Sequence, residues 1–224
     1  MAKVHGIPGE WARVKGAVIG LWPLFLGVFA AGGATVLIMT DPLPGATLLV
    51  VALVFILWRL SVGLRKIESF YTGARGEEKV SNILAELPDA YHVFNDFAAG
   101  GTHVDHVVVG PGGVFSIETK FWRGKVTIEE GRILLDGQLP DRAPLAQTLR
   151  EASLVRNELA KAGWNGLVTP VLTFASDSFV AHRANLNGTI VINASELKSG
   201  FASDRVVIPP AELNRLVNLM ESHG

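Results

Sequence analysis

Two stretches of the sequence combine acidic and basic side chains in a spacing that suits metal-assisted hydrolysis. Asp105 precedes a glycine-rich, turn-forming run, and the triplet that follows this run is Glu118, Thr119, Lys120. Carboxylates hold Mg²⁺ or Mn²⁺ in proteins, and a bound divalent ion lowers the pKa of water and screens the charge of a scissile phosphate. A lysine beside them orients the attacking water and offsets negative charge in the transition state. The pattern therefore suggests hydrolysis of a phosphodiester.

A two-residue loop inside this turn sets the pairing of the two flanking strands. It places Asp105 directly opposite Glu118, and His103 opposite Lys120. Opposed side chains lie on one face of a sheet, about 4.5–5.5 Å apart at Cβ. Like charges at that separation repel unless a cation lies between them, so the register predicts a metal site, with the carbonyl of Thr119 within reach as a further ligand. The alternative is a surface hairpin whose charges are solvated.

Two predicted helices carry further polar side chains that could line the same site. Glu77 lies three residues before Val80, on the apolar face of a helix expected over 75–87. An inward-facing carboxylate needs a partner, although a first-turn acid is also favoured by the helix dipole. Gln147 lies at the border of the apolar stripe of a second helix, where it either lines a site or is an ordinary border residue. That stripe consists of Leu145, Leu149, Ala152, Val155 and Leu159.

Three more side chains are candidates for contact with a nucleic acid. His103 shares the face of the site in this register, where it could bind phosphate or modulate the choice of metal. Arg123 and Lys125 follow Trp122, and two cations beside an aromatic ring could hold a nucleic-acid backbone. The alternative for each is an exposed strand residue. His106 falls on the opposite face and is predicted to be structural.

The elements that must position these residues predict an α/β or α+β fold with a mixed sheet flanked by helices. Apolar runs predict strands over 91–95, 103–109, 114–121, 125–135, 167–174, 189–193 and 206–208. Helices are expected over 75–87, 144–162 and 210–221, with a short one from 194. The glycine-rich run 110–113 joins two strands, so it does not indicate a phosphate-binding loop.

The N-terminal region is apolar and nearly free of charge. The stretch 16–40 carries no charge, and a second apolar run extends over 46–64; each is long enough to cross a bilayer. The cluster 41–45 between them predicts a turn. Residues 16–66 are therefore predicted to form a transmembrane hairpin, which contacts the lipid bilayer through residues 16–64. The alternatives are a helical hairpin buried in a soluble core and a cleaved signal peptide.

The charges around this hairpin predict its orientation. Lys3, Arg13 and Lys15 precede it, Arg59, Arg65 and Lys66 lie at its end, and the loop carries only Asp41. The positive-inside rule places both ends in the cytoplasm. We therefore expect a multi-pass protein of the cell membrane, with a cytoplasmic N-terminal segment over 1–15 and a cytoplasmic domain over 67–224.

Charge and composition narrow the function of the expected domain. Residues 67–224 hold 14 Lys and Arg against 19 Asp and Glu, which is not the basic surface that drives non-specific DNA binding. Affinity for a nucleic acid would come from a local patch or from bound cations. The chain has no cysteine, which excludes disulfides, thiolate zinc sites and cysteine nucleophiles.

Several segments together resemble a known family. They are Gly73-x-x-Gly76-Glu77, then 104–110, then 113–120 with Gly124 beyond it, and finally 143–147, which is similar to that family's Pro-x-x-Gln helix opening. In this order and spacing they resemble the nuclease-related domain (NERD) family over residues 73–162. Residues 163–224 would add C-terminal strands and a helix.

The resemblance implies a branch of the PD-(D/E)xK nuclease superfamily with a restriction-endonuclease-like mixed sheet. It implies that Asp105 and Glu118 bind the metal and that Lys120 is the catalytic lysine. Glu77 and Gln147 would be the acidic and polar residues of two core helices, and Glu77 is a further candidate ligand beside the Thr119 carbonyl. His103 departs from the polar or acidic residue expected at its position.

The leading hypothesis is a nuclease that hydrolyses DNA with Mg²⁺ or Mn²⁺ at the cytoplasmic face of the membrane. The rival is a non-catalytic, membrane-tethered nucleic-acid-binding or scaffold module that retains the nuclease fold. The acidic balance of residues 67–224 favours the rival, whereas the complete set of active-site residues favours the enzyme.

Overall fold

The computed structural model describes residues 1–201 and 207–222, including all their side chains except those of 64–67. The chain divides into two compact units. Unit 1 comprises Met1–Glu10 and Gly73–Gly224 and contains the sheet; unit 2, Trp11–Thr72, is helical. The N-terminal ten residues therefore join the sheet-containing unit, a placement that the sequence did not indicate.

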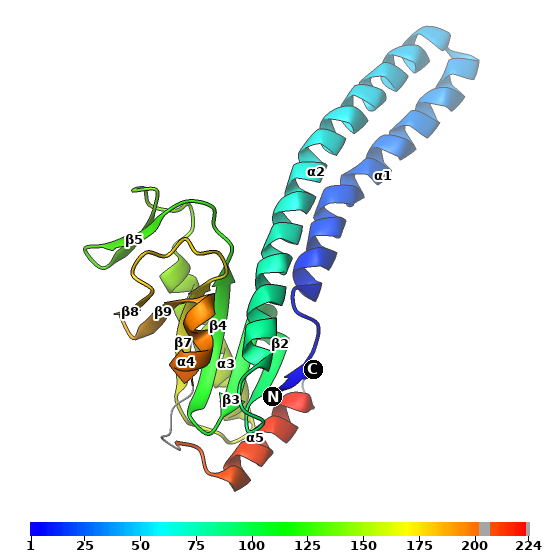
Figure 1. The fold of residues 1–224 in the computed structure, drawn as a ribbon. Helices are drawn as coiled ribbons and strands as arrows, with labels where there is room; N and C mark the ends of the chain where they lie inside the picture. Colours follow the sequence, from blue (N-terminus) through cyan, green and yellow to red (C-terminus); the bar gives the residue numbers. More distant parts are fainter. Residues whose placement is uncertain (202–206, 223–224) are drawn as a thin grey trace. The chain divides into compact units, whose positions relative to one another are not determined.

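The elements follow one another along the chain as shown in Figure 1. In order they are β1 (Lys3–His5), α1 (Glu10–Thr40), α2 (Pro42–Ala85), β2 (His92–Ala99), β3 (Thr102–Gly110), β4 (Gly113–Lys120), β5 (Val126–Glu129), β6 (Arg132–Leu135), α3 (Pro144–Lys161), β7 (Val168–Phe174), β8 (Arg183–Leu186), β9 (Thr189–Asn193), the 3₁₀ turn η1 (Ala194–Glu196), α4 (Leu197–Phe201) and α5 (Pro210–Glu221).

Unit 2 consists of α1 and most of α2, which are long and apolar enough to cross a membrane. The residues of α1 that are buried are all small or compact: Gly16, Gly20, Pro23, Gly27 and Ala34. A Cβ on Gly27 would meet the Ile56 side chain at 2.5 Å, so the two helices approach closely along this seam. The large apolar side chains of α1 point outward, and Phe29 is 83% exposed.

The boundaries of these helices correct two expectations. The predicted turn over 41–45 is shorter, because α2 begins at Pro42 and only Asp41 lies outside both helices. The Asp41 N–H donates to the Leu37 carbonyl, and the Gly45 N–H donates to the Asp41 carbonyl. Furthermore, the helix expected to begin at about residue 75 is the end of α2, which runs without a break from Pro42. Gly73 lies inside α2, and one glycine costs a helix only about 1 kcal/mol.

Unit 1 is built on a seven-stranded mixed sheet in the order β1-β2-β3-β4-β7-β9-β8, so the predicted fold class is confirmed. The pairs β2–β3, β3–β4 and β8–β9 are antiparallel, and β1–β2, β4–β7 and β7–β9 are parallel. One apolar core cluster unites β2, β3 and β4 with α3 and α5. A second unites the same strands with the unit 1 part of α2 and with α4. Helices therefore cover both faces of the sheet.

Three strand expectations need correction. The single strand expected over 125–135 is a separate hairpin, β5–β6, whose turn residues Glu130 and Gly131 both have positive φ. Two such residues between paired strands form a primed two-residue turn. Of the strand expected over 206–208, residue 206 lies outside the described residues, and 207–208 are not a strand. The edge strands β1 and β8 were not expected at all.

Candidate active site

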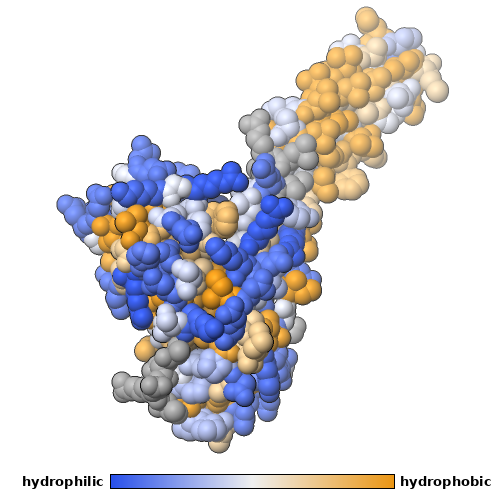
Figure 2. Space-filling model, viewed as in Figure 1, coloured by the Kyte–Doolittle hydropathy of each residue, from blue (hydrophilic) through white to orange (hydrophobic). Residues whose placement is uncertain are grey.

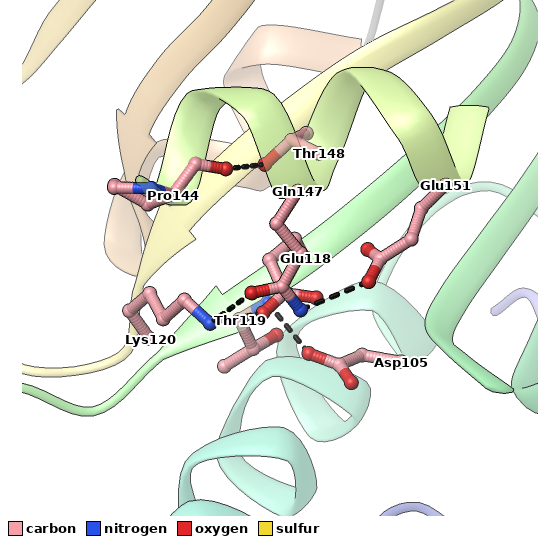
Figure 3. Close-up of polar contacts among 8 residues, drawn as sticks. All are labelled: Asp105, Glu118, Thr119, Lys120, Pro144, Gln147, Thr148 and Glu151. Carbon is pink, nitrogen blue, oxygen red and sulfur yellow. Dashed lines mark hydrogen bonds and ion pairs between the residues drawn. The ribbon is translucent and has the colours of Figure 1, made fainter. Parts of the chain in front are cut away.

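The hairpin β3–β4 carries the central candidates, and its register is as predicted near the turn. Val109 pairs with Val114, and the ladder continues to the pair His106–Ile117. Beyond that pair the ladder ends, so Asp105 and Glu118 are not direct cross-strand partners. Instead the Thr119 N–H donates a 2.7 Å hydrogen bond to Asp105 Oδ2. Where the two strands separate, the Asp105 carboxylate therefore accepts the hydrogen bond of a β4 backbone N–H in place of a β3 carbonyl (Figure 3).

A break in side-chain alternation explains this departure. Phe94 and Phe97 on β2 belong to the same core cluster although they are three residues apart, and Asp96 between them has a φ of 54°. Val104 and Val107 on β3 show the same three-residue spacing. Regular strands alternate with period two, so both strands change face at this point. An extrapolation of the ladder from the turn could not foresee the change.

Lys120 is held by two polar side chains from different elements. Its Nζ forms an ion pair with Glu118, its neighbour but one on β4. The same Nζ donates a 3.0 Å hydrogen bond to Gln147 Oε1 on the first turns of α3. Glu118 is 3% exposed, whereas Lys120 is partly exposed. The structure therefore brings Glu118, Lys120 and Gln147 together as predicted.

A fourth carboxyl group, Glu151, lies in the same network and was not expected from the sequence. Gln147 Nε2 donates a 2.9 Å hydrogen bond to Glu151 Oε1. Glu151 is 2% exposed, and its Oε2 is buried without a hydrogen-bond partner among the described residues. The buried face of α3 consists of Pro144, Thr148, Glu151, Ala152, Val155 and Leu159.

The predicted apolar stripe of α3 was wrong at Leu149, which is 38% exposed. The positions that share a face with Val155 at helical spacing are Thr148, Glu151 and Ala152. A stripe drawn only through apolar residues passed over the two polar ones. The spacing of four between Gln147 and Glu151 was the signal in the sequence that could have found this carboxyl group.

Glu77 approaches the site from α2 on the other side. It is 9% exposed and close enough to raise the pKa of Asp105. Gly76 permits this approach, because a Cβ there would meet Phe121 Cβ at 2.9 Å. The unit 1 part of α2 thus packs against the end of β4 and presents Glu77 toward Asp105.

The electrostatics of the site are dominated by buried negative charge. The pKa of Asp105 is raised well above its usual range, chiefly by burial and then by the charges of Glu118 and Glu77. Burial and the adjacent Glu118 raise the pKa of Glu151 to about 8. Lys120 is the cation that the contacts above place among these acids.

This donor set suits a hard divalent cation, which takes carboxylate and carbonyl oxygen ligands. Asp105, Glu118, Glu77, Glu151 and the Thr119 carbonyl are the groups that could hold it. The buried oxygen of Glu151 that lacks a partner is what an ion or a proton would satisfy. Over residues 1–201 and 207–222, no three His, Asp or Glu side chains are already grouped around one point, so the fit rests on donor type and burial.

The predicted nucleic-acid contacts lie away from this network. His103 neighbours Val104, which faces the core cluster of α3 and α5, so His103 points to the opposite face from Glu118. Its Nδ1 lies 3.1 Å from the Asp96 carbonyl oxygen and 3.2 Å from Asp96 Oδ1. The expected pairing of His103 with Lys120 is not formed, because the β3–β4 ladder ends at the pair His106–Ile117.

Arg123 and Lys125 are exposed just beyond β4, where the chain enters the β5–β6 hairpin. The Lys125 N–H donates to Asp136 Oδ1, and in the described part of the chain neither side chain forms a hydrogen bond or ion pair with Glu118 or Lys120. His106 is fully buried and its Nδ1 lies 2.7 Å from Asn95 Oδ1. Burial lowers the pKa of His106 to about 3, which agrees with a structural, neutral histidine.

Comparison with known proteins identifies the segment that holds this site. Residues 72–175 match the family model of the nuclease-related domain, NERD. This part of the chain is therefore similar to the nuclease-related domain. The match begins before Glu77 and ends just after β7, so the matched segment contains every member of the network. Comparison with curated proteins and with solved structures gives no match.

Proposed function

We propose that the nuclease-related domain hydrolyses phosphodiester bonds of DNA with Mg²⁺ or Mn²⁺ as its cofactor. The observation that carries this proposal is the convergence of Lys120, Glu118 and Gln147 beside Asp105. Burial of several carboxyl groups around one lysine is costly for a merely structural site, because like charges repel in a poorly solvated environment. In a site that binds a cation, the attraction between the cation and the carboxylates offsets this repulsion.

Each side chain has a distinct role in this proposal. Asp105 and Glu118 hold the cation, with Glu77 and the Thr119 carbonyl as additional oxygen donors. When bound, the cation would lower the pKa of a water molecule and screen the charge of the phosphate. Lys120 orients the attacking water and donates hydrogen bonds to the developing negative charge. Glu118 and Gln147 fix the Lys120 ammonium, and such positioning is a large part of phosphoryl-transfer catalysis.

Cleavage by the full-length protein in detergent micelles tests this function. Labelled double-stranded DNA, single-stranded DNA and RNA are incubated with Mg²⁺, with Mn²⁺ or with chelator. We expect metal-dependent cleavage of DNA, and Lys120→Ala should reduce the rate about 100-fold or more. The matched control is Lys161→Ala, an exposed lysine of α3 whose ammonium bonds Glu158. The proposal fails if no substrate is cut with either metal, or if Lys120→Ala cuts as fast as Lys161→Ala.

We further propose that α1 and the unit 2 part of α2 anchor this domain in the cell membrane. The arrangement of α1 supports this, because small residues line the seam and large apolar ones face outward, as helices in lipid are packed. Only 17% and 12% of the most apolar 18-residue stretches of α1 and α2 are buried, whereas the core helices of a soluble protein are mostly buried. The cationic flanks of the helical pair favour a cytoplasmic position for both termini by the positive-inside rule.

Accessibility of single cysteines tests the anchor, because the chain has none of its own. Asp41→Cys lies between the two helices, and Ser222→Cys follows α5. In intact cells, a membrane-impermeant maleimide should label Asp41→Cys and should label Ser222→Cys only after permeabilisation. Labelling of Ser222→Cys in intact cells would overturn the orientation, and recovery of the protein in the soluble fraction would overturn the anchor.

The acidic balance of the domain supports a second candidate function, a non-catalytic module tethered to the membrane. It predicts that Asp105→Ala leaves the cellular phenotype unchanged, whereas deletion of the hairpin abolishes it. The enzymatic proposal predicts that both changes abolish it.

A further inference from the structure

Glu151 is a buried carboxyl group that the roles above leave without a task. It sits one helical turn beyond Gln147 on α3, and its Oε1 accepts a hydrogen bond from Gln147 Nε2 at 2.9 Å. The other end of the same amide, Gln147 Oε1, accepts from Lys120 Nζ at 3.0 Å. Figure 3 shows Gln147 between Glu151 and the strand that carries Lys120.

The chemistry of the amide makes its orientation critical. A glutamine side chain carries an acceptor oxygen and a donor nitrogen that are nearly the same in shape. Only the oxygen can accept from a lysine, so rotation of the amide by half a turn would present a donor to the Lys120 ammonium. In the observed arrangement Glu151 Oε1 accepts from the NH₂ group, which leaves the amide oxygen for Lys120.

We propose that Glu151 is a positioning residue that sets the orientation of the Gln147 amide and thereby the place of the Lys120 ammonium. This inference rests on the proposed function for its catalytic consequence, but the orientation itself is a property of the protein without metal or substrate. The cost of burying a carboxyl group on α3 is then offset by the geometry it enforces at Lys120.

The surroundings of Glu151 separate it from an ordinary core residue. The other five residues of the buried α3 face are apolar or bond only their own helix, as Thr148 does with the Pro144 carbonyl at 2.9 Å. Glu151 instead bonds a side chain that reaches across to β4. The same helix carries another glutamate, Glu158, which bonds Lys161 and the Gly100 N–H. Glu158 therefore offers a matched control on the same element.

Selective labelling can observe this amide directly, because the chain contains only two glutamines, Gln138 and Gln147. Full-length protein in detergent micelles, labelled with ¹⁵N at glutamine side chains, should give two NH₂ signal pairs. Gln138 is exposed and serves as an internal reference. The Gln147 pair, identified by its loss in Gln147→Ala, should be shifted from the Gln138 pair and should exchange with water more slowly.

The expected result is that Glu151→Ala moves the Gln147 pair toward the exposed reference and speeds its exchange at least tenfold. Glu151→Gln should retain a shifted pair, because its side-chain oxygen still accepts. Glu158→Ala should leave the pair in place. A Gln147 pair that is unchanged in Glu151→Ala would overturn the positioning role, whether or not the protein cuts DNA.

Kinetics then measure the consequence. Glu151→Ala should lower kcat by about 10- to 100-fold, as a small misplacement of a catalytic group does, while KM stays within about twofold. Glu151→Gln should restore most of kcat, and Gln147→Ala combined with Glu151→Ala should be no worse than Gln147→Ala alone, since both act through one chain of bonds. Additive losses would contradict the proposal. Absence of cleavage by the wild type would instead refute the proposed function and leave the amide result standing.

Discussion

The two units of the chain differ in which residues they bury and which they expose. In unit 2, glycine and alanine line the helix seam, and residues such as Phe29 face outward. In unit 1, valine, isoleucine and phenylalanine fill the interior between sheet and helices, and Phe174 is 1% exposed. Figure 2 shows the outcome as an apolar surface on the helical pair and a largely hydrophilic face on the other unit.

The difference agrees with the proposal that unit 2 lies in lipid. Between helices in lipid there is no hydrophobic driving force, so close backbone contact through small residues takes its place. In water the burial of large apolar side chains dominates. The buried carboxyl groups of unit 1 are the exception to its own rule, and an exception of that cost is expected at a functional site.

The same substitution made in both units tests the difference in packing, and it is expected to give the largest effect. Phe174 packs against Trp122 and Phe179, so Phe174→Ala should destabilise unit 1 by about 3–5 kcal/mol. Phe29→Ala should change stability by less than about 0.5 kcal/mol, because the side chain is exposed. Urea unfolding of the full-length protein in micelles measures both. Equal losses would show that the two units are packed by one rule.

Enlarging glycines tests the seam of unit 2. A Cβ on Gly27 would meet Ile56 Cγ1 at 2.5 Å, whereas nothing lies within 4 Å of one on Gly32. Gly27→Ile should therefore cost about 1–3 kcal/mol, as overpacking does, and lower the thermal midpoint of helix loss measured by circular dichroism. Gly32→Ile is the matched control and should leave that midpoint unchanged. Equal midpoints would mean that the helices do not pack along this seam.

The pH dependence of stability tests whether the buried carboxyl groups of unit 1 have raised pKa values. Burial and Glu118 raise the pKa of Glu151 from 4.5 to about 8, so the folded state keeps a proton that the unfolded state releases. The resulting stability is complete below the unfolded pKa and is lost as the pH rises through the folded pKa. Without metal, wild type should therefore lose stability relative to Glu151→Gln between about pH 5 and about pH 9. Urea midpoints measure the difference, and a constant difference would contradict the assignment.

The sequence predicted the class of the fold, and it singled out Glu118, Lys120 and Gln147, which the structure brings together. Alternating apolar runs located β2, β3, β4, β7 and β9, and the turn after Gly110 predicted the β3–β4 register correctly as far as the pair His106–Ile117. These features are local, and local patterns report them well. The hairpin β8–β9 was missed although Asn187 and Gly188 are the residues that its primed turn favours.

Other features depend on contacts that no local pattern reports. β1 joins the sheet as a parallel neighbour of β2, far away in the chain. The change of face between Val104 and Val107 on β3 ends the ladder before the predicted pair Asp105–Glu118. Glu151 was not predicted from the sequence, because what marks it is its hydrogen bond to Gln147, and this bond depends on how α3 packs over β4. Tertiary packing decided each of these cases.

The most direct test of the account is whether the carboxyl cluster binds a divalent cation. Crystals of the full-length protein soaked in Mn²⁺ and measured at the manganese absorption edge would locate it by anomalous scattering. The account predicts a peak in contact with the carboxylates of Asp105 and Glu118, which Asp105→Asn abolishes. Well-ordered Asp105 and Glu118 side chains without a peak between them, at a saturating Mn²⁺ concentration, would contradict it.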